Sequence, residues 1–201
     1  MAENKQDTSI NTFRNKFLGG TRQNRFSVYG AFPKVAGFGA NTDLGDERLL
    51  IKAAQFPPAT MGIIPVPFRG RIAKIPGDRQ YLEWQIVVLD DAEGSIYNRF
   101  QKWNTLMNDP AQNTQDPNWS DAAGGGLTDW AIQHFNLEGE PIKTAVLSNC
   151  WPVEVGAIDL SYDLLDTVVE FPVTIAYDYY TTGMSLPDAL RPQSGNKTEG
   201  Q

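Results

Sequence analysis

Apolar and polar residues alternate along most of the middle of the chain, which is the pattern of β-strands with one buried face. The longest case is VEFPVTIAYDYY at 169–180, where the odd-numbered positions from Val169 to Tyr179 are all apolar or aromatic. Other strand candidates are NRFSVYGAF at 24–32, RLLIKAAQF at 48–56, QYLEWQIVVLD at 80–90, WAIQHFNLE at 130–138 and IDLSYDL at 158–164. The pattern predicts a mainly β fold with roughly seven to nine strands.

One further strand candidate, GIIPVPFRGRIAKI at 62–75, is interrupted by Pro65 and Pro67. Proline has no backbone N–H, and residues two apart in a strand direct their N–H groups to the same edge. We therefore expect this segment to lie at a monomer edge or to be irregular. Basic residues gather here, and we expect them to form a solvated or interface face rather than a nucleic-acid patch: Arg69, Arg71, Lys74 and Arg79.

One segment has a different period. Between Asp91 and Asn108 the large apolar residues are Ile96, Phe100, Trp103 and Met107, which recur at the spacing of one helix face. This predicts one amphipathic helix at about 91–108, and Asn-Asp-Pro at 108–110 is expected to end it. Residues 109–126 then form a long polar loop, a feature that is usually functional or disordered in a compact domain.

The adjacent carboxylates Asp90 and Asp91 precede this helix and have two possible roles. They could form a metal or acid–base pair, but no His, Cys or further carboxylate cluster nearby completes a metal shell. The alternative is helix capping, because Glu93 follows Asp90 by three residues, as in a capping box. We predict that Asp90 and Glu93 cap the helix and that the pair has no chemical role.

The two ends of the chain differ from its middle. Residues 1–23 are mostly polar, with an apolar cluster of Phe13, Phe17 and Leu18, and we expect an N-terminal arm there. Residues 181–201 are rich in proline, glycine and polar side chains, which predicts a flexible C-terminal tail. The predicted organisation is therefore the arm, a β-domain at 24–180 that contains the loop 109–126, and the tail.

The charge balance argues against a sequence-reading DNA-binding protein. The 201 residues carry a net charge of -7, and an acidic chain repels the phosphate backbone. No apolar run is long enough to span a membrane, and the first residues contain no apolar stretch of the kind a secretory signal needs. With a single cysteine an internal disulfide is impossible, which fits a reducing compartment.

The residues for enzyme chemistry are also scarce. His134 is the only histidine and Cys150 the only cysteine, so together they cannot supply a zinc site. Cys150 precedes Trp151 and Pro152 in an apolar setting that favours an inert thiol, and we expect catalytic use of neither residue. The glycine-rich stretches at 36–45 and 122–129 lack the helix or the Lys-Ser/Thr that a phosphate site requires. A β-rich domain with an edge strand, tails and a long loop is instead suited to assembly.

The order of these segments resembles the tail tube proteins of T4-like contractile-tailed bacteriophages. The resemblance covers about 24–180 and rests on NRFSVYGAF, AAQFPPATMGIIPVPFRGRIAKIPGDRQYLEWQIVVLDD, AEGSIYNRFQKWNTLMN, IKTAVLSNCWPVEVGAIDLSYD and VVEFPVTIAYDYY. No single motif is very specific, but the ordered series is fairly specific. The N-terminal arm, the insert at 36–47 and the C-terminal tail look longer than the family pattern, which suggests contacts with a sheath or the next ring.

The resemblance implies an antiparallel β-sandwich or barrel flanked by one α-helix, without catalysis, cofactor or metal. Its subunits would form hexameric rings with a continuous inner β-barrel, and stacked rings would form a hollow tube. The tube would conduct double-stranded DNA from capsid to host without binding it specifically. Implied partners are other copies of the chain, the tail sheath protein, and baseplate or initiator and tail terminator proteins, with no membrane insertion. The implied location is the virion tail, and the host cytoplasm during assembly.

Three alternatives remain open from the sequence. The same fold serves tubes of type VI secretion systems and extracellular contractile injection systems, so the origin of the tube is not decided. In another class, Trp119 and Trp130 near the long loop could belong to a carbohydrate- or ligand-binding β-sandwich. A hydrolase would have to use His134.

Overall fold

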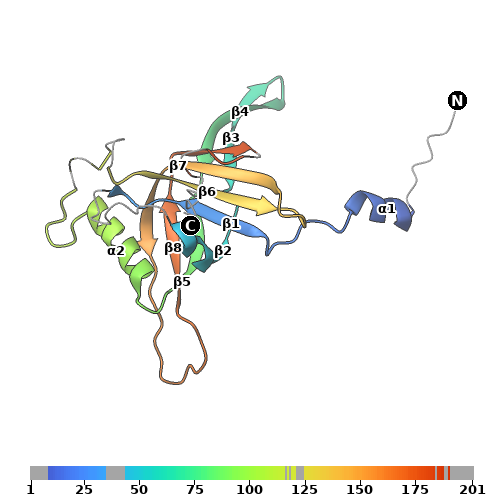
Figure 1. Ribbon diagram of the computed structural model, residues 1–201. Helices are drawn as coiled ribbons and strands as arrows, with labels where there is room; N and C mark the ends of the chain where they lie inside the picture. The colour runs from blue at the N-terminus through green and yellow to red at the C-terminus, as the bar shows by residue number, and fades with distance from the viewer. Residues whose placement is uncertain are drawn as a thin grey trace, which may run out of the picture.

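The structure is a computed structural model in which residues 9–34, 44–115, 117, 119–120, 125–183, 185–187 and 190 are described. Several predicted features lie wholly or partly outside these residues: the first eight residues of the N-terminal arm, most of the insert at 36–47, part of the loop 109–126 and most of the tail 181–201. The predicted mainly β fold is confirmed, because the described chain contains nine strands, all paired antiparallel (Figure 1).

The strands form two sheets that share β7 and a separate hairpin. They are β1 (Phe26–Gly30), β2 (Ile51–Ala54), β3 (Ala59–Phe68), β4 (Arg71–Tyr81), β5 (Trp84–Leu89), β6 (Thr128–Phe135), β7 (Pro141–Val155), β8 (Glu170–Ala176) and β9 (Tyr179–Gly183). The strand order in the body is β1-β6-β7-β8-β5-β2, with β9 paired to β7. The first part of β7 lies between β6 and β9, and its last residues pair with β8. Strands β3 and β4 pair only with each other.

Strand β7 changes sheets at Asn149, whose backbone has a left-handed φ of 59°. The Asn149 side chain donates to Asp178 Oδ2 at 2.6 Å, and the Asp178 N–H donates to the carbonyl of Ser148 at 3.1 Å. The chain therefore also turns at Asp178. The predicted single strand 169–180 is wrong in this respect, because β8 ends at Ala176 and β9 begins at Tyr179. Within β8 the predicted inward positions Phe171, Val173 and Ile175 are all fully buried.

The core lies between the sheets and under one helix, and aromatic rings fill much of it. Trp103 and Trp130 stack at 6.0 Å, and Phe32 meets both rings edge-on. Buried indoles need a partner for their N–H, and Trp103 donates to the carbonyl of Gly126 at 2.7 Å while Trp84 donates to that of Gln55 at 2.5 Å. The alternation predicted for 80–90 is confirmed from Trp84 onward, since Trp84, Ile86 and Val88 are buried.

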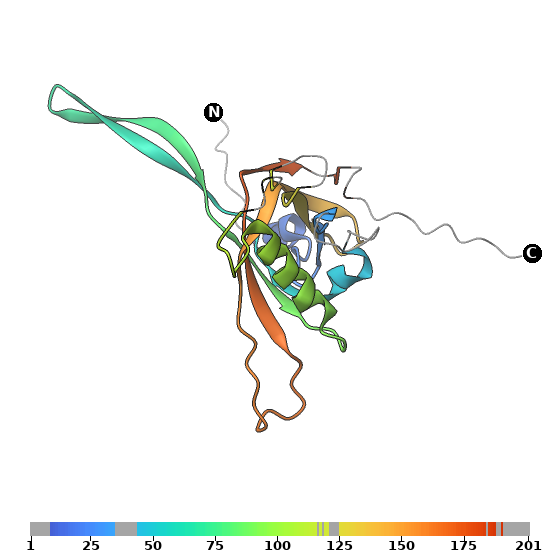
Figure 2. The same ribbon diagram turned by 90° about the vertical axis from the view of Figure 1, so that its left-hand side faces the viewer.

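The main helix, α2 (Ser95–Met107), covers the sandwich with the predicted face (Figures 1 and 2). Its buried residues are the four that the spacing predicted: Ile96, Phe100, Trp103 and Met107. A short 3-10 helix, η2 (Gly45–Leu50), precedes β2, and a second α-helix that the sequence analysis did not predict, α1 (Ile10–Phe17), lies in the N-terminal arm. The flanking role belongs to α2 alone, because α1 has no buried residue.

The predicted helix start and capping box are wrong. The N-cap residue is Gly94, with a left-handed φ of 65° that glycine adopts without strain, so the helix begins four residues later than predicted. Asp91 accepts hydrogen bonds from the Ser95 N–H at 2.6 Å and from Ser95 Oγ at 2.5 Å. The Asp90 N–H donates to the carbonyl of Val169, and Asp90 Oδ1 accepts from the N–H of Asp91, so Asp90 and Glu93 do not form the reciprocal bonds of a capping box.

The segment IDLSYDL at 158–164 is not a strand. It belongs to an irregular connection between β7 and β8, and its apolar positions Leu160 and Tyr162 are exposed rather than directed into a core. Alternation alone was misleading here because no sheet in the described part of the chain offers this segment a partner.

Candidate assembly surfaces

The most prominent feature outside the core is the β3–β4 hairpin, which projects from one end of the body (Figures 1 and 2). The turn residues Arg69 and Gly70 both have left-handed φ values, 46° and 79°, as a tight two-residue hairpin turn requires. At the base of the hairpin Tyr81 packs against Tyr177 and Tyr180, with ring centroids 6.0 and 5.5 Å apart. The sequence analysis identified this segment as one broken strand and missed the hairpin.

The hairpin is apolar on both faces. Cross-strand partners share a face, so Ile64 and Ile75 lie on one face and Pro67 and Ile72 on the other. Ile72 and Phe68 are each 65% exposed. A two-stranded ribbon is at best marginally stable in water, and an exposed apolar patch of this kind marks an interaction surface. Both faces of the hairpin therefore call for cover from outside the chain.

The two prolines decide which edge of the hairpin can pair with another strand. In a hairpin with a two-residue turn, the flanking pair Phe68–Arg71 exchanges hydrogen bonds and every second pair does the same. Pro65 and Pro67 fall between these pairs, so their missing N–H groups would have pointed away from β4. This agrees with the predicted edge position. The outer edge of β3 therefore lacks two backbone N–H donors, whereas the outer edge of β4 keeps the N–H groups of Ile72 and Lys74.

The hairpin is also basic. It carries the four basic residues that the sequence analysis grouped together, with Asp78 as its only acidic residue. Arg69 lies over the Phe68 ring at 5.3 Å. Among the described residues the only ion pair is Lys52–Glu170, which lies outside the hairpin. The cations of the hairpin therefore have no carboxylate partner among the described residues. The predicted interface face therefore has both apolar surface and positive charge.

A second projecting segment is the connection 157–169 between β7 and β8, which leaves the opposite end of the body in both views (Figures 1 and 2). Its base is held by hydrogen bonds from Gly156 N to Pro172 O and from Asp90 N to Val169 O, at 2.8 and 3.0 Å. Beyond the base its large apolar side chains are exposed: Leu160, Tyr162, Leu164, Leu165 and Val168. Its charged residues are Asp159, Asp163 and Asp166.

A third exposed apolar surface lies on α1, which stands apart from the body in Figure 1. Ile10, Phe13 and Phe17 follow one helix face and are 55 to 61% exposed. Ser9 caps the helix by accepting from the Thr12 N–H at 3.2 Å. An eight-residue helix is marginal by itself, so contact of this apolar face with another molecule would stabilise it.

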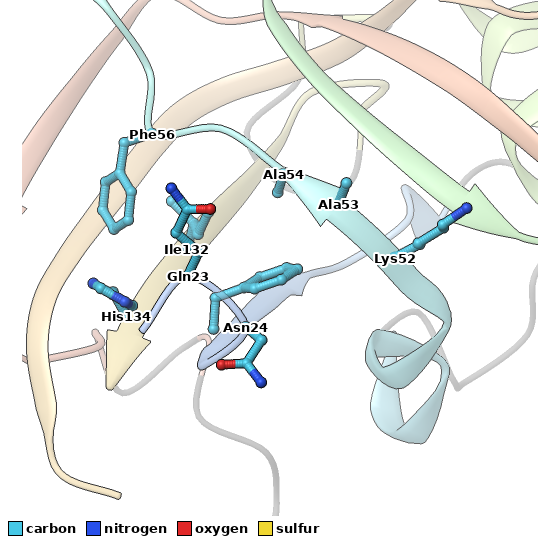
Figure 3. A pocket seen from close by; sticks show the side chains of 9 residues that line it. Gln23, Asn24, Lys52, Ala53, Ala54, Phe56, Ile132 and His134 are labelled. Carbon is cyan, nitrogen blue, oxygen red and sulfur yellow. The ribbon is translucent and has the colours of Figure 1, made fainter. Parts of the chain in front are cut away.

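An open hollow of about 610 Å³ lies where the edge strands β1 and β2 face each other (Figure 3). Its walls include Phe56, Ile132 and His134, with amides from Gln23 and Asn24. Within the described chain β1 pairs only with β6 and β2 only with β5, so both strands have an unpaired edge beside the hollow.

The titratable groups near this hollow do not form an acid–base pair with a nucleophile. His134 lies 2.8 Å from the carbonyl oxygen of Arg22 through Nε2, and its ring meets Phe56 edge-on at 6.4 Å. Lys52 is paired with Glu170. Such contacts fix the position of the imidazole but provide no activated nucleophile.

Cys150 is fully buried, and its Sγ donates to the carbonyl of Leu147 at 3.6 Å. Burial raises the pKa of the Cys150 thiol well above its ordinary range, which suppresses the reactive thiolate. Within the described residues no three His, Cys, Asp or Glu side chains lie close enough to hold a metal ion. No helix in this part of the chain is long and apolar enough to cross a membrane.

The aromatic residues that suggested a carbohydrate-binding platform have other roles. Trp130 is fully buried and donates from Nε1 to Thr128 Oγ1 at 3.2 Å. Trp119 packs partly buried against the core. The buried Trp130 therefore offers no ring face on which a sugar could stack.

Comparison with known proteins gives a consistent result. The family model described as "Phage tail tube protein" matches residues 21–183. The tail tube protein of Serratia phage KSP90 is 26% identical over 172 residues, which cover 84% of this chain and 94% of the relative. Tail tube protein gp19 of Enterobacteria phage T4 is 23% identical over 134 residues, which cover 64% of this chain and 77% of the relative.

Two solved structures are similar in fold. One is a chain of the extended sheath–tube complex of the extracellular contractile injection system PVC, with a TM-score of 0.54 and 16% identity over 89% of this chain and 99% of that one. The other is a chain of the tube-terminating cap of the anti-feeding prophage, with a TM-score of 0.56 and 17% identity over 82% and 91%.

Proposed function

The chain belongs to the phage tail tube protein family, and from that premise we propose that it forms hexameric rings that stack into the hollow tube of a contractile tail and conduct DNA. The observation that carries the proposal is the β3–β4 hairpin, whose two faces are both apolar and exposed in the single chain. Burial of apolar surface is the main favourable term in association. A subunit that projects such a hairpin gains free energy when other copies cover it.

The unpaired sheet edges support ring closure. In the described chain β1, β2 and β9 each have one free edge, and exposed edges are templates for pairing with another chain. A closed ring that joins these edges removes them, as a barrel does. We propose that the inner wall of the ring is a continuous β-barrel of this kind, with residues 24–180 and the end of β9 as the tube domain.

The charge of the chain supports passage of DNA without binding. A net charge of -7 repels the phosphate backbone. We propose that the basic hairpin is covered in the assembled tube, so that its cations do not line the lumen.

Partners follow from the same assembly. We propose that the outer surface of the tube contacts a tail sheath protein and that its two ends meet baseplate or initiator and terminator proteins. The arm 1–23 and the tail 181–201 are the segments we assign to contacts between rings or with the sheath. Assembly takes place in the host cytoplasm, the mature location is the virion tail, and the subunit has no enzymatic role.

Negative-stain electron microscopy of the purified full chain, alone and with a tail initiator added, tests this proposal. Hollow tubes or stacked rings are the expected result. A chain that stays monomeric at high concentration, with and without initiator, would reject the function.

A tube of an injection system is the second candidate, favoured by the fold similarity to the PVC sheath–tube complex. The genes next to this one separate the two cases. Capsid and terminase genes indicate a phage tail, whereas toxin genes without capsid genes indicate an injection system.

A further inference from the structure

Two exposed segments leave the body at opposite ends and are unlike in charge. The β3–β4 hairpin points upward and the connection 157–169 downward in both views, which differ by a rotation about the vertical axis (Figures 1 and 2). A contact between opposite ends of identical copies is a head-to-tail contact, and repetition of it produces a stack that grows along one direction.

The charges of the two segments are complementary. The hairpin carries Arg71 and Lys74 among its four basic residues, and the connection carries Asp159, Asp163 and Asp166 without any basic residue. Within the described chain none of these side chains forms an ion pair. Opposite charges on two surfaces orient an encounter and fix its register.

The apolar surfaces of the two segments are equally unpartnered. Phe68 is 65% exposed near the hairpin turn, and Leu160 and Leu165 are 82% and 81% exposed on the connection. Tyr162 is fully exposed. Interfaces of this kind combine a central apolar or aromatic cluster with a polar rim, and each segment supplies both components.

We propose that the β3–β4 hairpin of one copy docks on the connection 157–169 of the next copy along the tube. The inference rests on the proposed tube function and names the two surfaces that join successive rings. The apolar side chains of the hairpin pack against Leu160, Tyr162 and Leu165, and the basic residues of the hairpin pair with the three aspartates. This contact explains why a chain of net negative charge carries four cations on one exposed hairpin.

Charge reversal with rescue tests the pairing. Arg71→Glu/Lys74→Glu and, separately, Asp159→Lys/Asp163→Lys are each expected to raise the protein concentration needed for tube formation by about tenfold or more, because attraction becomes repulsion at a repeated contact. The combined fourfold variant, whose net charge equals that of the wild type, is expected to recover tube formation. Circular dichroism is the check that each variant is folded, which is expected because none of the four positions is buried.

Glu138→Lys in the exposed turn between β6 and β7 is the matched control and is expected to leave tube formation unchanged. An equal loss in this control, or no recovery in the combined variant, would overturn the pairing. If both reversal variants form tubes at the same protein concentration as the wild type, the pairing is overturned as well, while the tube function stays intact. A wild-type chain that forms no tubes would instead reject the proposed function, so the two failures are distinguishable.

Discussion

At the scale of single residues, Asp91 shows how the chain passes from a strand to its main helix. Its carboxylate accepts from both the N–H and the hydroxyl of Ser95, at the positive end of the helix dipole. The hydrogen bond from the Ser95 side chain is the main cause that lowers the pKa of Asp91 below its ordinary value of 3.8. The carboxylates that might have suggested chemistry in the sequence therefore organise the backbone.

Replacing Asp91 by Ala should lower the free energy of unfolding by about 1 kcal/mol, the usual cost of losing a helix cap. Glu93→Ala, two residues away and exposed, should change it by less than about 0.5 kcal/mol. Urea unfolding of both variants measures the difference. Equal effects of the two substitutions would contradict the assignment of the cap to Asp91 rather than Glu93.

The same interaction gives a pH dependence with a definite sign. The pKa of Asp91 is lowered in the folded chain. Its contribution to the free energy of unfolding is therefore present above the unfolded pKa and is lost as the pH falls through the folded pKa. The stability difference between wild type and Asp91→Ala should therefore shrink on acidification below about pH 4. A stability difference between the two proteins that stays constant down to the acid transition would contradict this role of Asp91.

Tyr177 is a second residue with a measurable signature. Among the described residues its buried hydroxyl has no hydrogen-bond partner, and burial raises its pKa to about 12. Tyr177→Phe removes an unsatisfied polar atom, so the free energy of unfolding at neutral pH should stay unchanged or rise by up to about 1 kcal/mol.

The alkaline behaviour of Tyr177 completes this test. A raised pKa means that the stability from the neutral phenol is complete below the ordinary pKa of 10.0 and is lost as the pH rises toward 12. Tyr177→Phe should lack this loss, whereas Tyr179→Phe, at an exposed position, should retain it. A fall in stability of Tyr177→Phe at neutral pH would show that the hydroxyl has a partner.

At the scale of elements, periodicity predicted those parts of the chain whose partners lie within the same chain. The helix face from Ile96 to Met107 and the inward positions of β5 and β8 are as predicted, because each packs on the common core. The failures are elsewhere. The alternation at 158–164 describes an exposed connection, and the segment at 62–75 folds back as a hairpin whose turn at Arg69–Gly70 was not recognised.

The proposed assembly gives both failures one physical cause. An apolar residue on a surface that another copy covers gives the same sequence signal as one in the core of the monomer. The candidate site could be predicted only as an edge and a basic cluster, through Pro65, Pro67 and the cations near them. That these residues share one projecting hairpin required the three-dimensional structure.

The hairpin predicts a clear separation between folding and assembly. Ile64→Thr and Ile72→Thr lie on opposite faces of the exposed hairpin and should change the free energy of unfolding by less than about 0.5 kcal/mol. Each should nevertheless abolish tube formation, because one face of the hairpin loses apolar burial. Thermal unfolding and sedimentation velocity measure the two properties.

Ile86→Thr in the core is the matched control for these substitutions. It should destabilise the fold by about 2 kcal/mol or more, since it replaces a buried ethyl group by a buried hydroxyl. If the hairpin variants instead unfold as easily as Ile86→Thr, the hairpin belongs to the folding core and its exposure in the single chain has no bearing on assembly.

At the scale of the whole molecule, the fold combines a fully buried core with exposed apolar segments and unpaired sheet edges around it. The sandwich buries its aromatic cluster completely, while the hairpin, the connection 157–169 and α1 expose large apolar side chains on different sides. The sheets also end in unpaired edges within the described chain. These features have a common explanation if the single chain is one repeat of a larger, self-complementary assembly.

The most direct measurement is a cryo-EM reconstruction of particles assembled from the purified full chain. The account predicts a hollow tube of stacked hexameric rings in which both faces of every β3–β4 hairpin are covered by neighbouring copies. A reconstruction in which the hairpin faces solvent, or a chain that forms no regular assembly at any concentration, would contradict it.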